Sequence, residues 1–275
     1  MIERDVSGQV VAITGGARGI GRATAHACAR AGMRVAIGDL DVALSETAAR
    51  EIGGEAVGLA VDVRERELFA AFLAQVEERL GPLDVLVNNA GVLFLGPFAR
   101  EDPAHTRAML EVNLAGVMSG TQLALERFQR RGHGHIVNVA SSAGLVGVAG
   151  GATYAATKHA VVGFTRALRG ELRGSAIGTT IVIPGIVRTE MIGGFRASPA
   201  TRIIEPASVA DAILRALRQE RAEVIIPVEL GLPARLVAGL PPRLADAIRR
   251  ALGVDRVMMD ADHAARSRYE ERAEV

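Results

Sequence analysis

The sequence is poor in several residues that often carry structure or chemistry. Its 275 residues include no tryptophan, two tyrosines, one cysteine and, among 32 basic residues, a single lysine. The one cysteine, Cys28, excludes a disulfide framework and suits a reducing compartment. No apolar run reaches the ~20 residues of a membrane span, and the polar N-terminus lacks the apolar core of a signal peptide. These absences favour a soluble cytoplasmic protein.

The sequence also lacks an excess of either charge. Its formal net charge is +1, and acids and bases are interspersed, so there is no electrostatic footprint for nucleic acid. Hydrophobic residues make up 49% of the chain, which is enough for a large core. No linker, low-complexity tract or internal repeat interrupts the chain before about residue 230. We therefore expect one domain over residues 1–228 and an extension over residues 229–275.

The single lysine, Lys158, lies four residues after one of the two tyrosines, Tyr154. On a helix, this spacing puts both side chains on one face. A neighbouring cation lowers the pKa of a phenol from its ordinary value of about 10, because the positive charge favours the phenolate. An ammonium is a compact charge that the planar, permanently protonated guanidinium of arginine does not replace. The pair therefore predicts an acid–base catalyst.

Short β-branched segments alternate with helical segments along the first 228 residues. The expected strands cover residues 9–14, 34–38, 56–61, 83–87, 136–140, 177–183 and 223–226. The expected helices cover residues 42–52, 64–79, 102–130, 152–173 and 206–219, besides one that follows the first strand. Seven strands separated by helices predict an α/β fold with a doubly wound parallel sheet and helices on both faces. Such a sheet binds its ligand at the carboxyl ends of the strands.

A glycine-rich turn joins the first expected strand to the first helix. Gly15, Gly19 and Gly21 would let the backbone approach a pyrophosphate, whose charge is stabilised at the helix N-terminus. The second expected strand ends at Asp39, where a carboxylate can accept hydrogen bonds from an adenosine ribose and repel a 2′-phosphate. The order of strand, glycine turn, helix, strand and acid predicts dinucleotide binding.

Five motifs follow one another in a fixed order. They are Thr14-Gly15 with Gly19-Ile20-Gly21, Asn88-Asn89-Ala90-Gly91, Asn113, Ser141, and Tyr154 with Lys158. With these motifs the sequence resembles the short-chain dehydrogenase/reductase family over residues 8 to about 228. Pro184-Gly185 followed by Thr189 is similar to the next motif of that family. The resemblance implies a Rossmann-type fold, a nicotinamide cofactor and a homodimer or homotetramer.

The resemblance also implies a catalytic tetrad of Asn113, Ser141, Tyr154 and Lys158. Tyr154 would exchange the substrate hydroxyl proton, and Ser141 would hydrogen-bond the substrate oxygen. Lys158 would lower the pKa of Tyr154 and bind the nicotinamide ribose, while Asn113 would hold a water that links Lys158 to solvent. Ser142 is the alternative to Ser141, which we prefer because it stands thirteen residues before Tyr154, as in the family.

The residues that the resemblance places at the cofactor cluster at strand ends and in the turns that follow them. They are Gly15, Arg18, Gly19, Ile20, Gly21, Asp39, Asp62, Val63, Asn89, Ala90, Gly91, Tyr154, Lys158, Pro184, Gly185, Val187 and Thr189. Arg18 argues for NADP, because a base before the second glycine often accompanies NADP use in the family. Asp39 argues for NAD, because a carboxylate that faces a 2′-phosphate is costly unless it is neutralised. We therefore expect NAD rather than NADP.

The loops that are expected to face the substrate are apolar. Besides Ser141, the candidate substrate contacts are Leu93, Val148, Met191 and Phe195. They predict a hydrophobic alcohol or ketone that is steroid-, retinoid- or lipid-like. The alternative is that these side chains simply pack the loops shut.

The C-terminal extension, residues 229–275, is expected to be helical. Its apolar residues recur at helical spacing, as in Leu244, Ala247, Ile248, Ala251 and Leu252. The extension could pack over the substrate loop, form a subunit interface or lie on a membrane surface. The membrane use is not favoured, because eight arginines are balanced by seven acids from residue 231 onward.

The leading prediction is an NAD(H)-dependent oxidoreductase that interconverts an alcohol and a ketone or aldehyde, with Tyr154 as general acid and base. An NADPH-dependent carbonyl or 3-oxoacyl-thioester reductase is the alternative enzyme. A non-catalytic nucleotide-binding scaffold is a minor alternative, because such proteins tend to lose the tyrosine or the lysine. No metal is expected, since His133 and His135 have no third ligand candidate.

Overall fold

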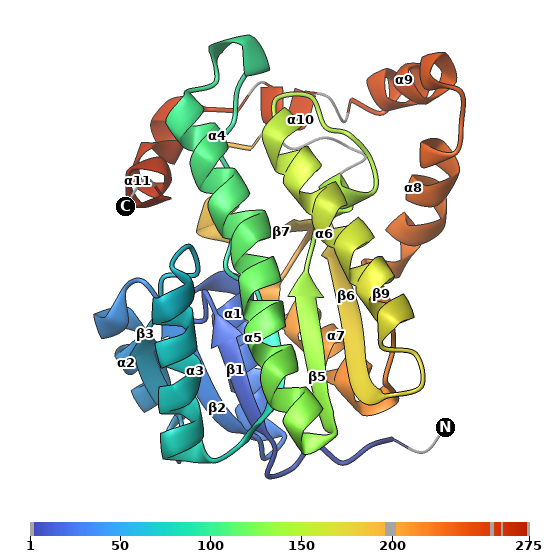
Figure 1. Cartoon of the computed structure of the whole chain (residues 1–275). Coiled ribbons are helices and arrows are strands. Elements are labelled where there is room, and N and C mark those ends of the chain that lie inside the picture. The colour runs from blue at the N-terminus through green and yellow to red at the C-terminus, as the bar shows by residue number, and fades with distance from the viewer. Residues whose placement is uncertain (1–2, 196–201, 254–255, 260, 274–275) are drawn as a thin grey trace.

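A computed structural model describes residues 3–195, 202–253, 256–259 and 261–273. Its centre is a seven-stranded parallel sheet with the strand order β3-β2-β1-β4-β5-β6-β9 (Figure 1). The strands are β1 (Val10–Thr14), β2 (Arg34–Asp39), β3 (Val57–Ala60), β4 (Leu83–Asn88), β5 (His133–Val139), β6 (Ala176–Pro184) and β9 (Glu223–Ile226). The predicted doubly wound α/β fold is confirmed.

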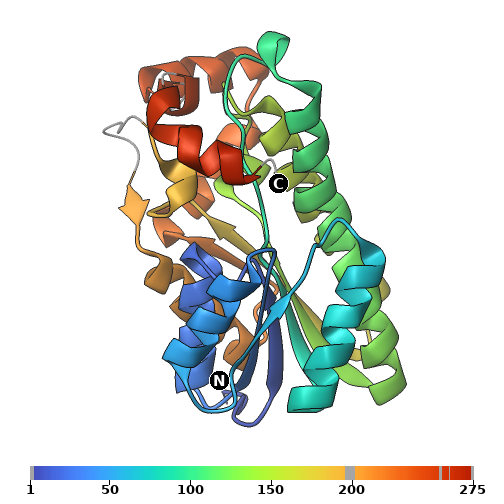
Figure 2. The same cartoon turned by 90° about the vertical axis from the view of Figure 1, so that its left-hand side faces the viewer.

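Helices cover both faces of this sheet (Figures 1 and 2). One face carries α1 (Gly19–Arg30), α2 (Val42–Ile52) and α7 (Pro206–Gln219). The other carries α3 (Arg66–Leu80), α5 (Gly116–Arg131) and α6 (Ala152–Glu171). Successive residues of β1 enter opposite cores: Val11 and Ile13 pack with the first group, and Val10 and Ala12 with the second. Burial on both faces explains why the strands read as continuous apolar runs.

Local signals set the helix boundaries. Asp41 begins α2, because its side chain accepts a hydrogen bond from Leu44 N at 3.0 Å. Pro206 opens α7 at a position where no amide hydrogen is needed. Gly132 ends α5 with a left-handed φ of 80°, which glycine adopts without strain. The predicted helices 42–52 and 206–219 agree with these bounds.

Three regions differ from the prediction by more than one or two residues at an element's end. β5 begins at His133 rather than at residue 136, because it pairs with β6 from its first residue, so both histidines lie in a strand. The predicted helix 102–130 is α4 (Pro103–Leu110), a π-helical turn (Glu111–Ala115) and α5 in succession. The long loop expected after residue 184 contains a small parallel pair, β7 (Ile186–Val187) and β8 (Ile203–Ile204), and a 3₁₀ turn, η4 (Glu190–Ile192).

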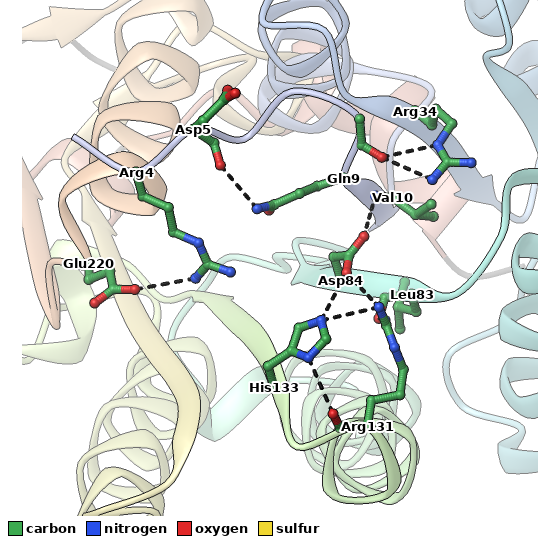
Figure 3. A network of polar contacts seen from close by, with 11 residues as sticks. Arg4, Asp5, Gln9, Val10, Arg34, Leu83, Asp84, Arg131, His133 and Glu220 are labelled. Carbon is green, nitrogen blue, oxygen red and sulfur yellow. Dashed lines mark hydrogen bonds and ion pairs between the residues drawn. The ribbon is translucent and has the colours of Figure 1, made fainter.

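A polar network ties the sheet together at the amino ends of its central strands (Figure 3). Asp84 of β4 accepts hydrogen bonds from Val10 N at 2.8 Å and from Arg131 Nη2 at 3.0 Å. His133 Nε2 lies 3.6 Å from the same carboxylate, and Arg131 also donates to Leu83 O. The network therefore joins β1, β4 and β5 at the end of the sheet opposite to the predicted site.

The C-terminal extension arches over the other end of the sheet, as the orange and red segments of Figures 1 and 2 show. It comprises a 3₁₀ turn, η5 (Val228–Leu230), followed by α8 (Gly231–Ala238), α9 (Pro242–Ala251), α10 (Arg256–Met259) and α11 (His263–Ala273). Of its helices, α11 contacts η4. In the described part of the chain, no helix combines the length and the apolarity that a bilayer span requires.

Candidate active site

A cavity of about 1370 Å³ lies at the carboxyl ends of the strands. The strand order reverses between β1 and β4, and doubly wound sheets bind their ligands at such a reversal. The cavity wall takes residues from the glycine-rich turn, from the ends of β2, β4, β5 and β6, from η4 and from α8 to α11. One cavity thus joins the predicted dinucleotide site to the predicted catalytic residues.

The glycine-rich turn has no room for side chains. A Cβ atom at Gly21 would lie 2.2 Å from Gly15 O, and one at Gly15 would lie 2.8 Å from Ala90 Cα. Gly15 and Gly19 also have positive φ angles of 61° and 49°, which strain other residues. No side chain caps the N-terminus of α1, so the first-turn amides have no side-chain acceptor. This geometry suits a phosphate that approaches the backbone.

Two acids follow the turn at neighbouring strand ends. Asp39 accepts hydrogen bonds from Ala17 N and Asp41 N, both at 3.2 Å. Burial raises the pKa of Asp39, and these hydrogen bonds oppose the shift. Burial also acts to raise the pKa of Asp62, but the hydrogen bonds and charge of Arg64 outweigh it and lower that pKa. The Asp39 carboxylate is thus oriented by backbone amides and has no arginine hydrogen-bonded to it in the described residues.

Arg18, which argued for NADP, is engaged by acids. Its guanidinium lies 2.9 Å from Asp41 and 3.5 Å from Glu190 of η4. Glu190 in turn lies 2.7 Å from Arg272 of α11. A chain of alternating charges therefore runs from the glycine-rich turn through η4 to the C-terminal helix.

Tyr154 lies on the first turn of α6 at the cavity wall and is 7% exposed. Burial raises its pKa, and hydrogen bonding from Ser141 acts in the opposite direction. Ser141 follows β5, and its Oγ accepts a hydrogen bond from Ala143 N at 3.2 Å. Ser141 and Ser142 both line the cavity. The effect of Ser141 on the pKa of Tyr154 favours Ser141, while Ser142 begins the next 3₁₀ turn.

Lys158 lies one helical turn after Tyr154 and is 4% exposed. Its Nζ is 5.7 Å from the centroid of the Tyr154 ring and donates a hydrogen bond to Val139 O at 3.1 Å. Burial lowers the pKa of Lys158 to about 8. The expected lowering of the Tyr154 pKa by Lys158 is not found in the protein alone, because burial of the phenol dominates and the ammonium binds the backbone.

Asn113 lies in the π-helical turn and is completely buried. Its Nδ2 donates to Val92 O and its Oδ1 accepts from Val92 N, both at 2.8 Å. The amide therefore fixes the backbone that follows Gly91. A Cβ at Gly91 would lie 3.1 Å from Asn113 Oδ1 and 3.6 Å from Lys158 Nζ, so both side chains lie close to Gly91. The water relay through Asn113 stays a prediction.

Asn89 fixes the turn between β4 and the cavity. Its Nδ2 donates to Thr14 O at 2.9 Å and to Gly15 O at 3.0 Å, and its backbone amide donates to Thr14 Oγ1. Asn89 thus joins the end of β4 to the end of β1, on the two sides of the strand-order reversal. Asn89 therefore supports the turn that lines the cavity.

The cavity brings together nearly all of the predicted site residues. Every predicted cofactor and substrate contact belongs to its wall except Gly21. Gly21 lies behind the wall, because its Cα packs against the carbonyl of Gly15. Asn113 also lies behind the wall, since it is buried against Val92. These two residues therefore shape the site without facing the cavity.

The predicted substrate contacts form one apolar cluster. Leu93, Val148, Met191 and Phe195 pack together with Tyr154, and Ala273 of α11 joins them. Met258 and Tyr269 of the extension also line the cavity, although the sequence analysis named neither. The signal that could have found Tyr269 is composition, since it is the second of the chain's two tyrosines.

The fold and the cavity are those of a Rossmann-type protein with a tyrosine, a serine and a lysine in the cavity wall. A family model described as short chain dehydrogenase matches residues 9–200. The ketoacyl reductase HetN of Nostoc sp. is 35% identical over 260 residues, which cover 90% of this chain and 91% of that protein. Estradiol 17-beta-dehydrogenase 11 of Rattus norvegicus is 31% identical over 262 residues, which cover 92% and 86%.

A solved structure has the same fold. It is a short chain dehydrogenase/reductase from Burkholderia phymatum in complex with NAD, with a TM-score of 0.78 and 25% identity, covering 85% of this chain and 94% of that one. The chain belongs to the short-chain dehydrogenase family, and it is an oxidoreductase. The glycine-rich turn and the uncapped α1 fit the NAD(P) cofactor of such enzymes.

Proposed function

We propose that the protein is an NAD(H)-dependent oxidoreductase that interconverts a secondary alcohol and a ketone on a hydrophobic substrate. The observation that carries this proposal is the position of Tyr154, which interacts with Ser141 in the wall of an apolar cavity continuous with the glycine-rich turn. An alcohol and an aldehyde would react by the same chemistry. NAD would accept a hydride during oxidation and return it during reduction.

In the oxidation direction, Tyr154 would act as a phenolate that takes the proton of the substrate hydroxyl. Burial raises the Tyr154 pKa in the protein alone, so the positive nicotinamide ring of bound NAD would have to favour the phenolate. Ser141 donates a hydrogen bond to the substrate oxygen and stabilises the charge that develops there. Lys158, whose pKa is lowered to about 8, supplies a nearby positive charge and a proton that can exchange near neutral pH. General acid–base catalysis of this kind contributes roughly 10²–10⁴-fold. In the reduction direction the same groups return the proton.

NAD is proposed over NADP on the charges around the ribose site. Asp39 ends β2 with a carboxylate held by two backbone amides. A 2′-phosphate at this place would meet that carboxylate, and Arg18 is already paired with Asp41 and Glu190. Like charges brought together cost several kcal/mol. NAD carries no such phosphate, so it fits these charges better.

The second candidate is an NADPH-dependent carbonyl or 3-oxoacyl-thioester reductase. Two observations favour it: the similarity to a protein named ketoacyl reductase and the presence of Arg18 in the cavity wall. It would use the same tyrosine and serine. The dissociation constants of NADH and NADPH, measured side by side, distinguish the two candidates.

The assembly and the location of the protein are also proposals. We expect a homodimer or homotetramer through α4 and α5, where Leu110 is 43% exposed and Met118 is 44% exposed. A cytoplasmic location agrees with the single buried cysteine, Cys28. Sedimentation velocity at several concentrations measures the subunit number, and a monomer at all of them would contradict the expected interface.

The experiment for the proposed function uses Tyr154→Phe beside the wild type. NADH formation from hydrophobic secondary alcohols is followed by absorbance, and NADH affinity is followed by fluorescence. We expect wild-type turnover, and in the variant a loss of at least about 10³-fold with NADH affinity within threefold, since only the acid–base group is removed. A variant that keeps more than a few per cent of the activity contradicts the role of Tyr154.

A further inference from the structure

The most deeply buried charged side chain in the described part of the chain belongs to the C-terminal extension. Arg266 of α11 has 0% exposure. Its Nη1 donates to Met191 O at 2.8 Å and to Gly193 O at 3.1 Å. Its Nη2 donates to Leu93 O at 2.8 Å, and its Nε donates to Glu270 at 2.8 Å. One guanidinium therefore joins α11 to two loops that are far apart in the sequence.

Those two loops carry predicted substrate contacts, Leu93 in one and Met191 in the other. A buried charge is costly unless every donor finds an acceptor, so Arg266 fixes both loops at a set distance from α11. Phe195 and Tyr269 flank the guanidinium, with ring centroids 5.7 Å and 5.2 Å from its central carbon. The apolar side of the cavity is thus organised around Arg266.

Leu93 is held by α11 at both of its backbone groups. Its carbonyl accepts from Arg266, and its amide donates to the Tyr269 hydroxyl at 2.9 Å. Leu93 is 2% exposed and lies in the same apolar cluster as Tyr154. Two residues of the C-terminal helix therefore set the position of a substrate wall that lies more than 170 residues earlier in the chain.

In this arrangement the Tyr269 hydroxyl accepts a hydrogen bond from Leu93 N. A phenol has one proton to donate, and among the described residues no acceptor is found for it. Burial raises the pKa of Tyr269, and a negative charge on Tyr154 acts in the same direction, so the group stays a protonated donor. A buried polar hydrogen without an acceptor is unfavourable. Because Tyr269 lines the cavity, a ligand oxygen could satisfy it.

We propose that Tyr269 determines substrate specificity by donating a hydrogen bond to a second oxygen of the substrate, and that Arg266 is the positioning residue that holds Tyr269 and Leu93 in place. This inference rests on the proposed function and deepens it. The substrate class becomes a hydrophobic secondary alcohol, or its ketone, that carries a second oxygen.

The test uses matched probes that differ only in that oxygen. One series is 2-alkanols of graded length, and the other replaces one methylene by an ether oxygen, which can only accept a hydrogen bond. For each pair, kcat/KM with NAD and the dissociation constant from the protein–NADH complex are measured. In the wild type we expect the ether of the best-fitting length to be favoured over the alkanol of the same length by about 10- to 100-fold in kcat/KM. This is the usual discrimination by a buried hydrogen bond.

Tyr269→Phe keeps the ring and removes the hydroxyl. We expect the preference for the ether over the matched alkanol to fall to within threefold of unity. The hydroxyl also accepts from Leu93 N, so both probes can lose activity together, and the ratio within the variant is the quantity that tests the inference. Ser267→Ala on the same helix is the control, since Ser267 is exposed and bonds only its own helix. It should keep the full preference.

Arg266→Lys tests the positioning role. Lysine keeps the charge but has three donors instead of a five-donor fork, so it cannot bind both loops and Glu270 together. We expect KM for the ether to rise at least tenfold, with kcat within about threefold and a full stoichiometry of NADH binding, which counts the folded protein. Glu270→Gln weakens the same cluster more gently and gives a smaller shift of the same sign if Arg266→Lys does not fold.

The outcomes separate this inference from the proposed function. If the wild-type protein turns over neither series, the proposed function is contradicted. Turnover or binding with no preference for the ether at any length, or no measurable binding of either series, overturns the inference about Tyr269. A preference that survives Tyr269→Phe overturns it as well. A folded Arg266→Lys protein with wild-type KM and preference overturns the positioning role.

Discussion

The half of the cavity assigned to the cofactor is built from backbone, whereas the half assigned to the substrate is built from side chains. The cofactor half comprises the residues of the glycine-rich turn between Gly15 and Ile20 and the acids Asp39 and Asp62, which stand at the ends of neighbouring strands. The substrate half comprises the cluster around Leu93 and Met191 together with Arg266 and Tyr269. The first is local in sequence, and the second joins segments separated by 173 and 176 residues.

This difference indicates where variation is tolerated. A Cβ atom at Gly15 or Gly21 meets backbone, which cannot move aside without disturbing β1 and α1. The substrate half depends on the C-terminal extension, which lies outside the segment that the family model matches. We infer that Arg266 and Tyr269 of the C-terminal extension contribute to the substrate preference together with contacts such as Leu93 and Met191 in the first 200 residues.

Lys158→Arg is expected to give the largest effect, because Lys158 serves both halves. The guanidinium is longer and planar, and the space around Nζ is closed by Val139 O and by Gly91. We expect kcat/KM to fall by about 10²–10³-fold, which corresponds to about 3–4 kcal/mol of lost transition-state stabilisation. Steady-state kinetics at saturating NAD measure it. Activity within threefold of the wild type would mean that any cation serves at this position.

Gly21→Ala should weaken cofactor binding and leave the substrate preference unchanged. Its Cβ would lie 2.2 Å from Gly15 O and 2.6 Å from Asn89 Nδ2, so the turn must shift. We expect NADH affinity to weaken at least tenfold, or about 1.4 kcal/mol, with the ether preference unchanged. Gly163→Ala, on the exposed side of α6 with nothing within 4 Å of its Cβ, is the matched control. It should bind NADH normally and be slightly more stable.

Asp39→Ser should change only the choice of cofactor. Removing the carboxylate removes its repulsion of a 2′-phosphate, while the serine hydroxyl still accepts from the neighbouring amides. We expect the ratio of NADP to NAD affinity to rise by about 10- to 100-fold, since a unit charge at this range is worth roughly 1–3 kcal/mol. Titration with both reduced cofactors checks this. An unchanged ratio would place cofactor choice elsewhere, with Arg18 as the next residue to change.

The pH dependence of stability tests the lowered pKa of Lys158 in the protein without substrate. The pKa of Lys158 is about 8 in the folded protein, against an ordinary value of 10.5. Between these values the unfolded chain binds a proton that the folded protein does not, so this residue makes the unfolding free energy rise with pH. Its cost is fully present below pH 8. From pH 7.5 to 9.5 we expect a gain of roughly 2 kcal/mol from this group.

The comparison for this effect is Lys158→Met, which cannot titrate. Urea unfolding of both proteins at pH 7.5 and 9.5 gives the difference of differences, in which Cys28 and the other titrating groups largely cancel. The wild type should gain on the variant as the pH rises. A difference that is flat or that falls with pH would contradict the lowered pKa of Lys158.

The cofactor half could be predicted from the sequence because its signals are local. Strand ends, glycine positions and the acid at residue 39 fall within single strand–turn–helix units, and the structure gives the same seven strands. The π-helical turn at Glu111–Ala115 was not predictable, because its pattern is that of an ordinary helix and the buried Asn113 is satisfied by Val92 and Thr157, which lie outside that helix.

The substrate half was reached in part. Leu93, Val148, Met191 and Phe195 were predicted as apolar loop residues, and they do meet in one cluster. Tyr269 and Arg266 were missed, since α11 is a polar helix whose periodicity gives no hint of a buried arginine. Their partners are backbone groups of Leu93, Met191 and Gly193, and a backbone partner leaves no mark in the sequence.

The central claim is that one cavity combines a cofactor site built largely from backbone with a hydrophobic substrate site. The measurement that tests it is the formation of NADH from NAD, or of NADPH from NADP, by the wild-type protein. Both are compared for 2-alkanols of graded length. We predict that kcat/KM rises with chain length by about threefold or more per methylene, the value of burying one CH₂ group, and that NAD is preferred throughout. Highest activity on short polar alcohols, or turnover with NADP alone, would contradict the account.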